Sequence, residues 1–344
     1  MSQFTYPTAA ELREIEQDKL PVLTTGDPIF SIMPIRQTEF YNIMWEQKDN
    51  YAGLQGLRGL DGKPLKVDSI GISQYQMTPG VYGEFMEVSE EEITLRRQIG
   101  SFASVIDLST LVMEKQDILL NRRIDRLRYI GWTTLAGSYS VASKTKNLTQ
   151  ADAWQVQKQV STVPWTTFAT ATPLSDFRAA QLLSRGKSVS FRADATAYLN
   201  QVTLNNLLQN TNANDIAGRR TNGLSYPLNL MEVNKIWQGE ALPMLEVYDE
   251  GYLDDTTLNS AGKPTFKPFI PDGYVFLVGK RRGATPGEYQ MCRNINNPNM
   301  AAGAYTKVFD TIDREVPRRI EVHDGHNGGP ALLYPGDVVW MKVY

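Results

Sequence analysis

The sequence is poor in the side chains that stabilise small secreted proteins and that perform much of enzyme chemistry, with one cysteine and two histidines among 344 residues. Cys292 alone cannot form an intrachain disulfide, which fits assembly in a reducing cytoplasm. No apolar run reaches the roughly 18 residues of a membrane span. The first residues lack the basic start and apolar stretch of a secretory signal.

The chain also lacks a basic excess, because 35 lysines and arginines face 38 acidic residues, for a net charge of -3. This balance excludes a dedicated nucleic-acid binder but leaves open a protein with one face toward nucleic acid. Basic residues do cluster at 122–128 and at 280–282. We interpret each cluster as a solvated helix face or hairpin end rather than a DNA contact. The 42% hydrophobic and 21% charged composition is typical of a globular protein with a real core.

Catalytic motifs are missing as well. No G-x-S-x-G nucleophile elbow occurs. The carboxylate runs at 90–92 and 254–255 are explained by a capped helix and a solvated loop. Cys292 has no histidine near it in sequence, which favours a half-buried structural cysteine. The sequence therefore predicts no enzyme and no cofactor.

One short motif, H-D-G-H, contains both histidines. His323, Asp324 and His326 are residue types that ligate metals. The glycines at 325, 328 and 329 and Asn327 instead favour a turn, and no cysteine or third histidine lies nearby in sequence. We interpret the motif as a polar hairpin loop, and predict no metal site.

What the sequence does contain is glycine at every third position of Y-A-G-L-Q-G-L-R-G-L-D-G-K-P-L-K, residues 51–66. A phosphate-binding loop needs glycine five positions before Gly62 and serine or threonine after Lys63, and these positions hold Leu57 and Pro64. Four repeats without proline enrichment also exclude collagen. We interpret the glycines as a flexible tip between an extended strand at 35–48 and a second extended segment at 66–87.

Helix signals surround this projection. Thr8 and Glu11 predict a capped helix over 8–20, followed by an extended arm rich in proline and glycine. Ser89 predicts a second capped helix that ends at Gly100. A long helix is predicted over 107–137, about 45 Å at 1.5 Å per residue, with an apolar stripe through Leu127. We expect it to lie half exposed across a sheet, with a polar strand pair after it.

The second half of the chain alternates helix and strand patterns. Helices are predicted at 173–185, 194–208 and 228–237, strands at 188–192, 244–248 and 274–278, and a polar loop at 249–264. The last residues, 331–344, form a strong strand pattern that must pair with an earlier strand. We therefore expect the first and last parts of the chain to share a sheet.

This order of elements resembles the major capsid proteins of tailed bacteriophages, in particular the branch of the lambda major head protein. The resemblance rests on the glycine-tipped stretch at 44–64, Y-Q-M-T-P-G-V-Y-G-E-F at 75–85, V-S-E-E-E-I-T-L-R-R-Q-I-G at 88–100, the helix end at 122–137, the strand at 269–279 and the closing residues 331–344. It implies an α+β Hong Kong 97-type fold. Its expected parts are an N-terminal arm (1–34), an extended loop (35–87), a peripheral domain (88–150 plus 305–344) with the spine helix, and an axial domain (151–304).

The resemblance also implies a function. Such chains assemble as pentamers and hexamers into an icosahedral shell around double-stranded DNA, in the host cytoplasm, and become part of the virion. It implies a separate scaffolding protein and a portal as partners, and leaves a decoration protein open. Only about thirty residues precede the first capsid-like strand, which favours scaffolding by another polypeptide.

Within that family resemblance, the glycine-rich tip is expected to lie over an adjacent subunit. The candidate contact residues are Gly53, Gly56, Arg58, Gly59, Asp61, Gly62 and Lys63. Glycine would let the tip bend and accept φ values that other residues resist. Two alternatives stay open: an encapsulin-type nanocompartment shell, and a carbohydrate- or nucleic-acid-active enzyme that would depend on His323 or Asp324.

Overall fold

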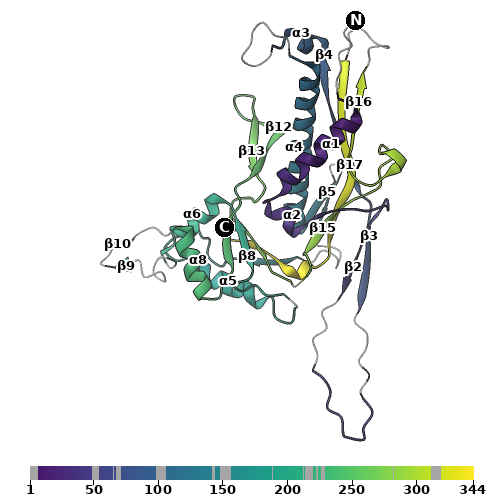
Figure 1. Ribbon diagram of the computed structural model, residues 1–344. Helices are drawn as coiled ribbons and strands as arrows, with labels where there is room; N and C mark the ends of the chain where they lie inside the picture. The colour runs from purple at the N-terminus through teal and green to yellow at the C-terminus, as the bar shows by residue number, and fades with distance from the viewer. Residues whose placement is uncertain are drawn as a thin grey trace.

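The computed structural model describes residues 7–48, 54–64, 66, 71–97, 106–141, 144–147, 156–187, 189–211, 213, 220–221, 224–225, 229–281, 283–310 and 319–344 (Figure 1). The helices within these residues are α1 (Ala9–Thr24), α2 (Pro28–Ile32), α3 (Glu90–Leu95), α4 (Leu108–Leu135), α5 (Pro173–Leu182), α6 (Gln201–Leu208) and α8 (Leu230–Gly239). The strands are β1 (Ile35–Gln37), β2 (Ile43–Lys48), β3 (Ile72–Met77), β4 (Gly80–Ser89), β5 (Ser138–Val141), β6 (Lys144–Asn147), β7 (Gln157–Val160), β8 (Thr196–Leu199), β9 (Arg220–Thr221), β10 (Leu224–Ser225), β11 (Met244–Val247), β12 (Gly251–Leu258), β13 (Pro264–Pro268), β14 (Tyr274–Val278), β15 (Gly287–Met291), β16 (Tyr305–Asp310), β17 (Arg319–Leu332) and β18 (Val338–Lys342).

The first sheet is organised around β17, a strand of 14 residues. The sheet order is β1-β15-β17-β16, and β4 pairs along the other edge of β17. All pairings of β17 are antiparallel, and the ladder with β4 runs from Arg319 opposite Ser89 to Gly328 opposite Gly80. Residues 35–37 and 80–89 therefore share a sheet with residues 319–332, although the closing strand β18, on which this prediction rested, lies in the other sheet.

The H-D-G-H motif lies inside β17, so the predicted hairpin loop at this place is wrong. Its glycines are needed because other groups approach the strand closely. A Cβ on Gly325 would lie 2.5 Å from the Tyr82 carbonyl oxygen, and one on Gly328 would lie 2.6 Å from the Gln290 carbonyl oxygen. Here glycine makes room for neighbouring strands rather than forming a turn.

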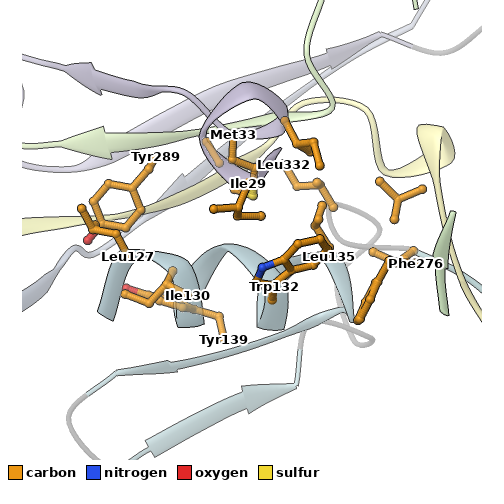
Figure 2. Packing of buried hydrophobic residues seen from close by; sticks show 14 of the residues in the cluster. Ile29, Met33, Leu127, Ile130, Trp132, Leu135, Tyr139, Phe276, Tyr289 and Leu332 are labelled. Atoms are coloured by element: carbon orange, nitrogen blue, oxygen red, sulfur yellow. The ribbon is translucent and has the colours of Figure 1, made fainter. Parts of the chain in front are cut away.

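The predicted long helix is confirmed as α4, which packs along β4 and β17 of the first sheet (Figure 1). Asp107 occupies the N-cap position, but its side chain makes no capping hydrogen bond and instead accepts one from the Ser109 hydroxyl. Leu127, Ile130 and Leu135 are buried in the main core with Trp132 (Figure 2). Packing of this face, more than intrinsic propensity, stabilises so long a helix.

The N-terminal segment differs from its prediction. The Thr8–Glu11 capping box is confirmed, but α1 continues through Pro21 to Thr24. The predicted extended arm after it is wrong, because α2 follows and its Ile29 side chain is buried against α4 (Figure 2). Asp27 caps α2, and proline at the next position is favourable at a helix start because it gives up no hydrogen bond there.

The second sheet has the order β11-β8-β14-β18-β7 and packs with α5, α6 and α8 around a separate core. The closing strand β18 pairs with β14 and β7. It therefore pairs with earlier strands as predicted, but in the second sheet and not in the one that contains β4. The predicted helix at 194–208 is wrong at its start, since 196–199 form β8 and Asn200 caps α6.

Several other helices and strands also differ from their predicted boundaries. The predicted strand at 35–48 is two strands, β1 and β2, in different sheets. The helix after Ser89 ends at Leu95, and the predicted loop at 249–264 contains β12, paired with β13. In place of the strand predicted at 188–192, of which residue 188 lies outside the described residues, 189–192 hold one bridge, between Ser190 and Lys280. The polar pair β5–β6 is confirmed, and the four-part domain division stays a prediction.

Candidate subunit-interface elements

The glycine-rich stretch forms the far end of a projection whose base is rooted in the main core. Strands β2 and β3 pair antiparallel from Ile43 opposite Met77 outward. Ile43, Trp45 and Met77 are buried, and the Trp45 ring stacks on Tyr75 at 5.7 Å between centroids. The described tip, residues 54–64, lies well away from the body of the molecule (Figure 1). The base is thus fixed while the tip is presented outward.

The structure describes all but one of the predicted contact residues at this tip. Gly53 lies outside the described residues. Gly56, Arg58, Gly59, Asp61, Gly62 and Lys63 are all exposed. A turn brings part of this set together: the Gly62 amide donates to the Gly59 carbonyl at 3.0 Å, and Arg58 Nη1 donates to the Gly62 carbonyl at 2.9 Å. Arg58 therefore closes the turn within its own loop. Whether the set contacts a neighbour stays a prediction.

The predicted need for unusual φ values is wrong for two of these glycines. Neither Gly59 nor Gly62 adopts a left-handed φ. A Cβ on Gly59 would meet nothing within 4 Å, whereas one on Gly62 would press on the Gly59 backbone at 3.3 Å. The tight turn thus explains why position 62 holds glycine. No contact among the described residues explains why position 59 does.

Three leucines that the sequence reasoning missed stand out at the tip. Leu54, Leu57 and Leu60 are 101%, 99% and 100% exposed. Burying one leucine side chain is worth roughly 1.5–3 kcal/mol, so the three together carry roughly 5–9 kcal/mol of unrealised burial. The repeat Gly-Leu-x was the available signal, because leucine has no reason to recur in a solvated linker. These leucines, which we call the leucine tip, indicate a partner surface.

A second exposed apolar element is the hairpin β12–β13. Its inner face contacts α4, where Tyr252 meets Tyr129 edge to face at 5.5 Å and Arg122 pairs with Asp255 at 3.2 Å. On the outer face Leu253 and Phe266 are directly opposite one another and are 66% and 58% exposed. An isolated two-stranded hairpin is marginally stable, so this bare face indicates a further contact.

The first sheet also has an aromatic row on its uncovered face. The Phe85 ring stacks on His323 at 5.0 Å, and Phe309 meets the same imidazole edge to face at 5.0 Å. Half or more of each phenylalanine side chain is exposed. His323 Nε2 lies 2.8 Å from Glu321 Oε2 on the same strand.

The histidines and the cysteine of the described chain do not form a reactive site. His326 is buried against Tyr289, whose hydroxyl lies 2.9 Å from its Nε2, and burial lowers the pKa of His326 to about 3. His323 lies instead on the uncovered face of the sheet. Burial raises the pKa of Cys292 to about 11, so its thiol is protonated, as expected of a structural cysteine. No group of three or more His, Cys, Asp or Glu side chains within the described ranges is arranged to hold a metal ion.

The arginines at 122–128 are only in part the solvated face that the sequence suggested. Arg126 is exposed and makes no ion pair among the described residues, whereas the other three are paired. Arg122 pairs with Glu84 of β4, and Arg123 pairs with Asp324 and Glu16. Arg128 pairs with Asp27 at 2.6 Å. These arginines fasten α1, the start of α2 and the sheet to α4, which explains why they cluster on one helix.

Comparison with known proteins identifies solved structures that are similar to this chain. No protein-family model and no curated protein matches the chain. Among solved structures, a protein from a prophage of E. coli CFT073, described as its capsid protein, is 13% identical, with a TM-score of 0.57 over 96% of this chain and 99% of its own length. The capsid of cyanophage A-1(L) is 11% identical, with a TM-score of 0.52 over 91% of this chain and 90% of the other. A phage-related protein of Bordetella bronchiseptica RB50 is 11% identical, with a TM-score of 0.51 over 97% and 95%.

These likenesses extend over nearly the whole of each chain, so they concern the complete architecture and not one shared motif. The chain has the α+β Hong Kong 97-type fold found in tailed-phage capsid proteins. The predicted membership of the lambda branch stays a prediction. Within the described part of the chain, no helix is both long and apolar enough to cross a membrane.

Proposed function

We propose that this chain is the major capsid protein of a tailed bacteriophage, which associates as pentamers and hexamers into an icosahedral shell around double-stranded DNA. The observation that carries the proposal is the leucine tip. Leu54, Leu57 and Leu60 are fully exposed at the end of a projection that the fold holds away from its own core. A neighbouring copy is the partner that a capsid fold supplies.

The exposed apolar surfaces lie on separate elements, as expected of a subunit that contacts several neighbours in a shell. The leucine tip, the outer face of β12–β13 and the Phe85–Phe309 row belong to three different elements (Figure 1). A subunit that contacts neighbours on several sides needs several such surfaces, since a closed shell has no free edge. Each contact is small, but it is repeated at every subunit boundary, which makes assembly cooperative.

Other proposed partners follow from the same function. A separate scaffolding protein would guide assembly in the host cytoplasm, a portal would occupy one vertex, and the mature shell would be part of the virion. The proposal needs no catalytic group. It is consistent with a buried, protonated Cys292 and a buried, neutral His326.

The direct test is to purify the chain and examine it by sedimentation velocity and negative-stain electron microscopy, alone and co-expressed with a candidate scaffolding protein from the same phage genome. Closed shells of uniform size in the second preparation support the proposal. A chain that sediments as a monomer in both preparations contradicts it. Shells that contain a protein cargo rather than nucleic acid would favour the nanocompartment alternative.

Deletion of residues 53–62 examines the role of the loop itself. The base strands β2 and β3 pair through residues outside the deletion, so the subunit is expected to stay folded with unchanged helix content by circular dichroism. Shell formation should be lost. Normal shells from the deletion variant would show that the tip is only a linker, and outright unfolding would show that it belongs to a core.

A further inference from the structure

We infer that the loop between β15 and β16, residues 293–304, is a contact at which two copies of this chain meet through the same surface. The inference rests on the proposed function, because a shell supplies the second copy. The loop lies beyond β17, on the opposite side of that strand from the β12–β13 hairpin (Figure 1). It belongs to none of the three apolar surfaces described above.

Four large side chains of this region are exposed. Ile295 is 80% and Met300 47% exposed, and on the neighbouring segment 38–42 Phe40 is 62% and Tyr41 53% exposed. Arg293 connects the two segments, because its amide donates to the Phe40 carbonyl at 3.3 Å and its Nε donates to the Met300 carbonyl at 3.2 Å. We call these four side chains the loop patch. Exposed apolar side chains gathered in this way mark protein contact sites.

The loop is held in a conformation that is uncommon outside glycine. Asn299 and Met300 have φ values of 54° and 53°, in the left-handed region. The buried Asn297 fixes the backbone around them, since its Nδ2 donates to the carbonyls of Ala301 and Gly303, both at 3.2 Å. Backbone of this kind concentrates at binding surfaces, and a preformed loop loses little entropy when a partner covers it.

The absence of charge in the loop indicates which partner it meets. None of the eleven residues from 294 to 304 is charged. The leucine tip, the β12–β13 hairpin and the aromatic row of the first sheet instead contain charged side chains, such as Lys63, Asp255 and Glu321. When two copies meet through one surface, residues near the symmetry axis face their own counterparts, so a charge there would meet a like charge. An uncharged loop avoids that repulsion.

The charges at the border of the loop patch fit the same arrangement. Arg293 and Lys307 are bound to the loop itself, Arg293 through the Met300 carbonyl and Lys307 through Asn296 Oδ1 at 3.1 Å. Glu39, which precedes Phe40, is exposed. Across a twofold axis residue i of one copy meets residue j of the other and the reverse, so these opposite charges can pair between the copies.

The first test is a cross-link between identical residues in the assembled protein. Ile295→Cys is oxidised in purified shells and examined by non-reducing electrophoresis. A disulfide-linked dimer is expected, because a contact between identical surfaces brings the same residue of two copies together. The native Cys292 is fully buried, so wild-type shells should give no dimer. Leu253→Cys, at an exposed apolar position on β12, is the matched control and should stay monomeric.

The second test places charge at the contact. Ile295→Lys and Ile295→Glu should each assemble poorly when expressed alone, since like charges would meet there. The two variants co-expressed should form shells again, because unlike charges then face each other. The melting temperatures of the isolated variant subunits should equal that of the wild type, since the Ile295 side chain lies in solvent.

Closed shells of Ile295→Cys that yield no more dimer than Leu253→Cys would overturn the inference. Normal assembly of the single charge variants would also overturn it, as would a mixture that assembles no better than either variant alone. The failures of the two proposals are distinguishable. Wild-type shells without the contact between identical residues remove only this inference, whereas dimers that depend on the loop patch, in a chain that never forms shells, remove only the proposed function.

Discussion

Arg123 of α4 binds Asp324 of β17, with 2.5 Å between Nη1 and Oδ1, and both side chains are almost completely buried. The same guanidinium also pairs with Glu16 of α1. One cation thus connects the N-terminal helix, the spine helix and the central strand of the first sheet, three elements far apart in sequence. The H-D-G-H motif is therefore structural at this residue, since Asp324 serves as a partner for Arg123.

The first prediction concerns this buried arginine. Arg123→Met should lower the free energy of unfolding by about 3–5 kcal/mol, because two carboxylates would lose their shared cation in a buried place. Arg122→Met is the matched control on the next residue. Its pair with Glu84 is half exposed, and such pairs are worth about 0–1 kcal/mol. Urea denaturation of both variants measures the difference, and equal effects would refute the central role of Arg123.

The second prediction concerns pH. Burial raises the pKa of the Asp324 carboxyl group to about 6, above the ordinary value of 3.8. At pH values between these two, the folded chain therefore keeps the carboxyl proton that the unfolded chain releases. The contribution of this group to stability should therefore grow as pH falls from 7 toward 4, and shrink as pH rises through 6.

Asp324→Asn removes that titration. The free energy of unfolding of the wild type, minus that of the variant, should thus increase steadily between pH 7 and pH 4.5 in urea denaturation. A difference that stays constant, or that falls as the solution becomes more acidic, would show that the carboxylate is not held in its protonated form by burial.

The third prediction concerns the buried face of α4. Leu127→Asp would place a charge among Ile130 and Tyr289 in the main core, and the variant should accumulate as insoluble protein. Ile118→Asp makes the same change on the same helix at a side chain that is 44% exposed, and it should remain soluble. Soluble, assembled protein carrying Leu127→Asp would mean that the buried stripe is misassigned.

The fourth prediction concerns the glycines of β17. Gly325→Ala should cost about 1–3 kcal/mol of stability, because its Cβ would lie 2.5 Å from the Tyr82 carbonyl oxygen and the two strands would have to separate. Gly59→Ala in the loop tip, where a Cβ meets nothing within 4 Å, should leave the melting temperature unchanged. Equal melting temperatures for the two variants would contradict the close approach.

Features set by local sequence were predictable. The Thr8–Glu11 capping box, the helix start at Ser89 and the length of α4 all follow from patterns within a few turns of chain. These signals act between neighbours in sequence, so no tertiary information is needed to recognise them. The projection of the glycine-rich stretch was predictable for the same reason.

Features set by distant partners were not. The glycines at 325, 328 and 329 suggested a turn because their local preference is for turns. In the fold, Tyr82, Tyr289 and Ile43 respectively lie where side chains at these three positions would have been. Arg122, Arg123 and Arg128 of α4 looked solvated because their carboxylate partners lie up to 201 residues away in sequence. The leucine tip was not predicted because a Gly-Leu-x repeat indicates a contact surface only once the fold shows that its leucines pack against no other part of the described chain.

The central claim is that neighbouring copies bury the leucine tip when the shell assembles. The most direct measurement is sedimentation velocity with electron microscopy on Leu54→Ser, Leu57→Ser, Leu60→Ser, a triple variant that keeps every glycine and charge of the loop. The variant should show wild-type helix content and melting temperature but no closed shells, with Gln55→Ala, at an exposed position of the same loop, as a control that still assembles. Shells formed by the triple variant at the wild-type protein concentration would contradict the account.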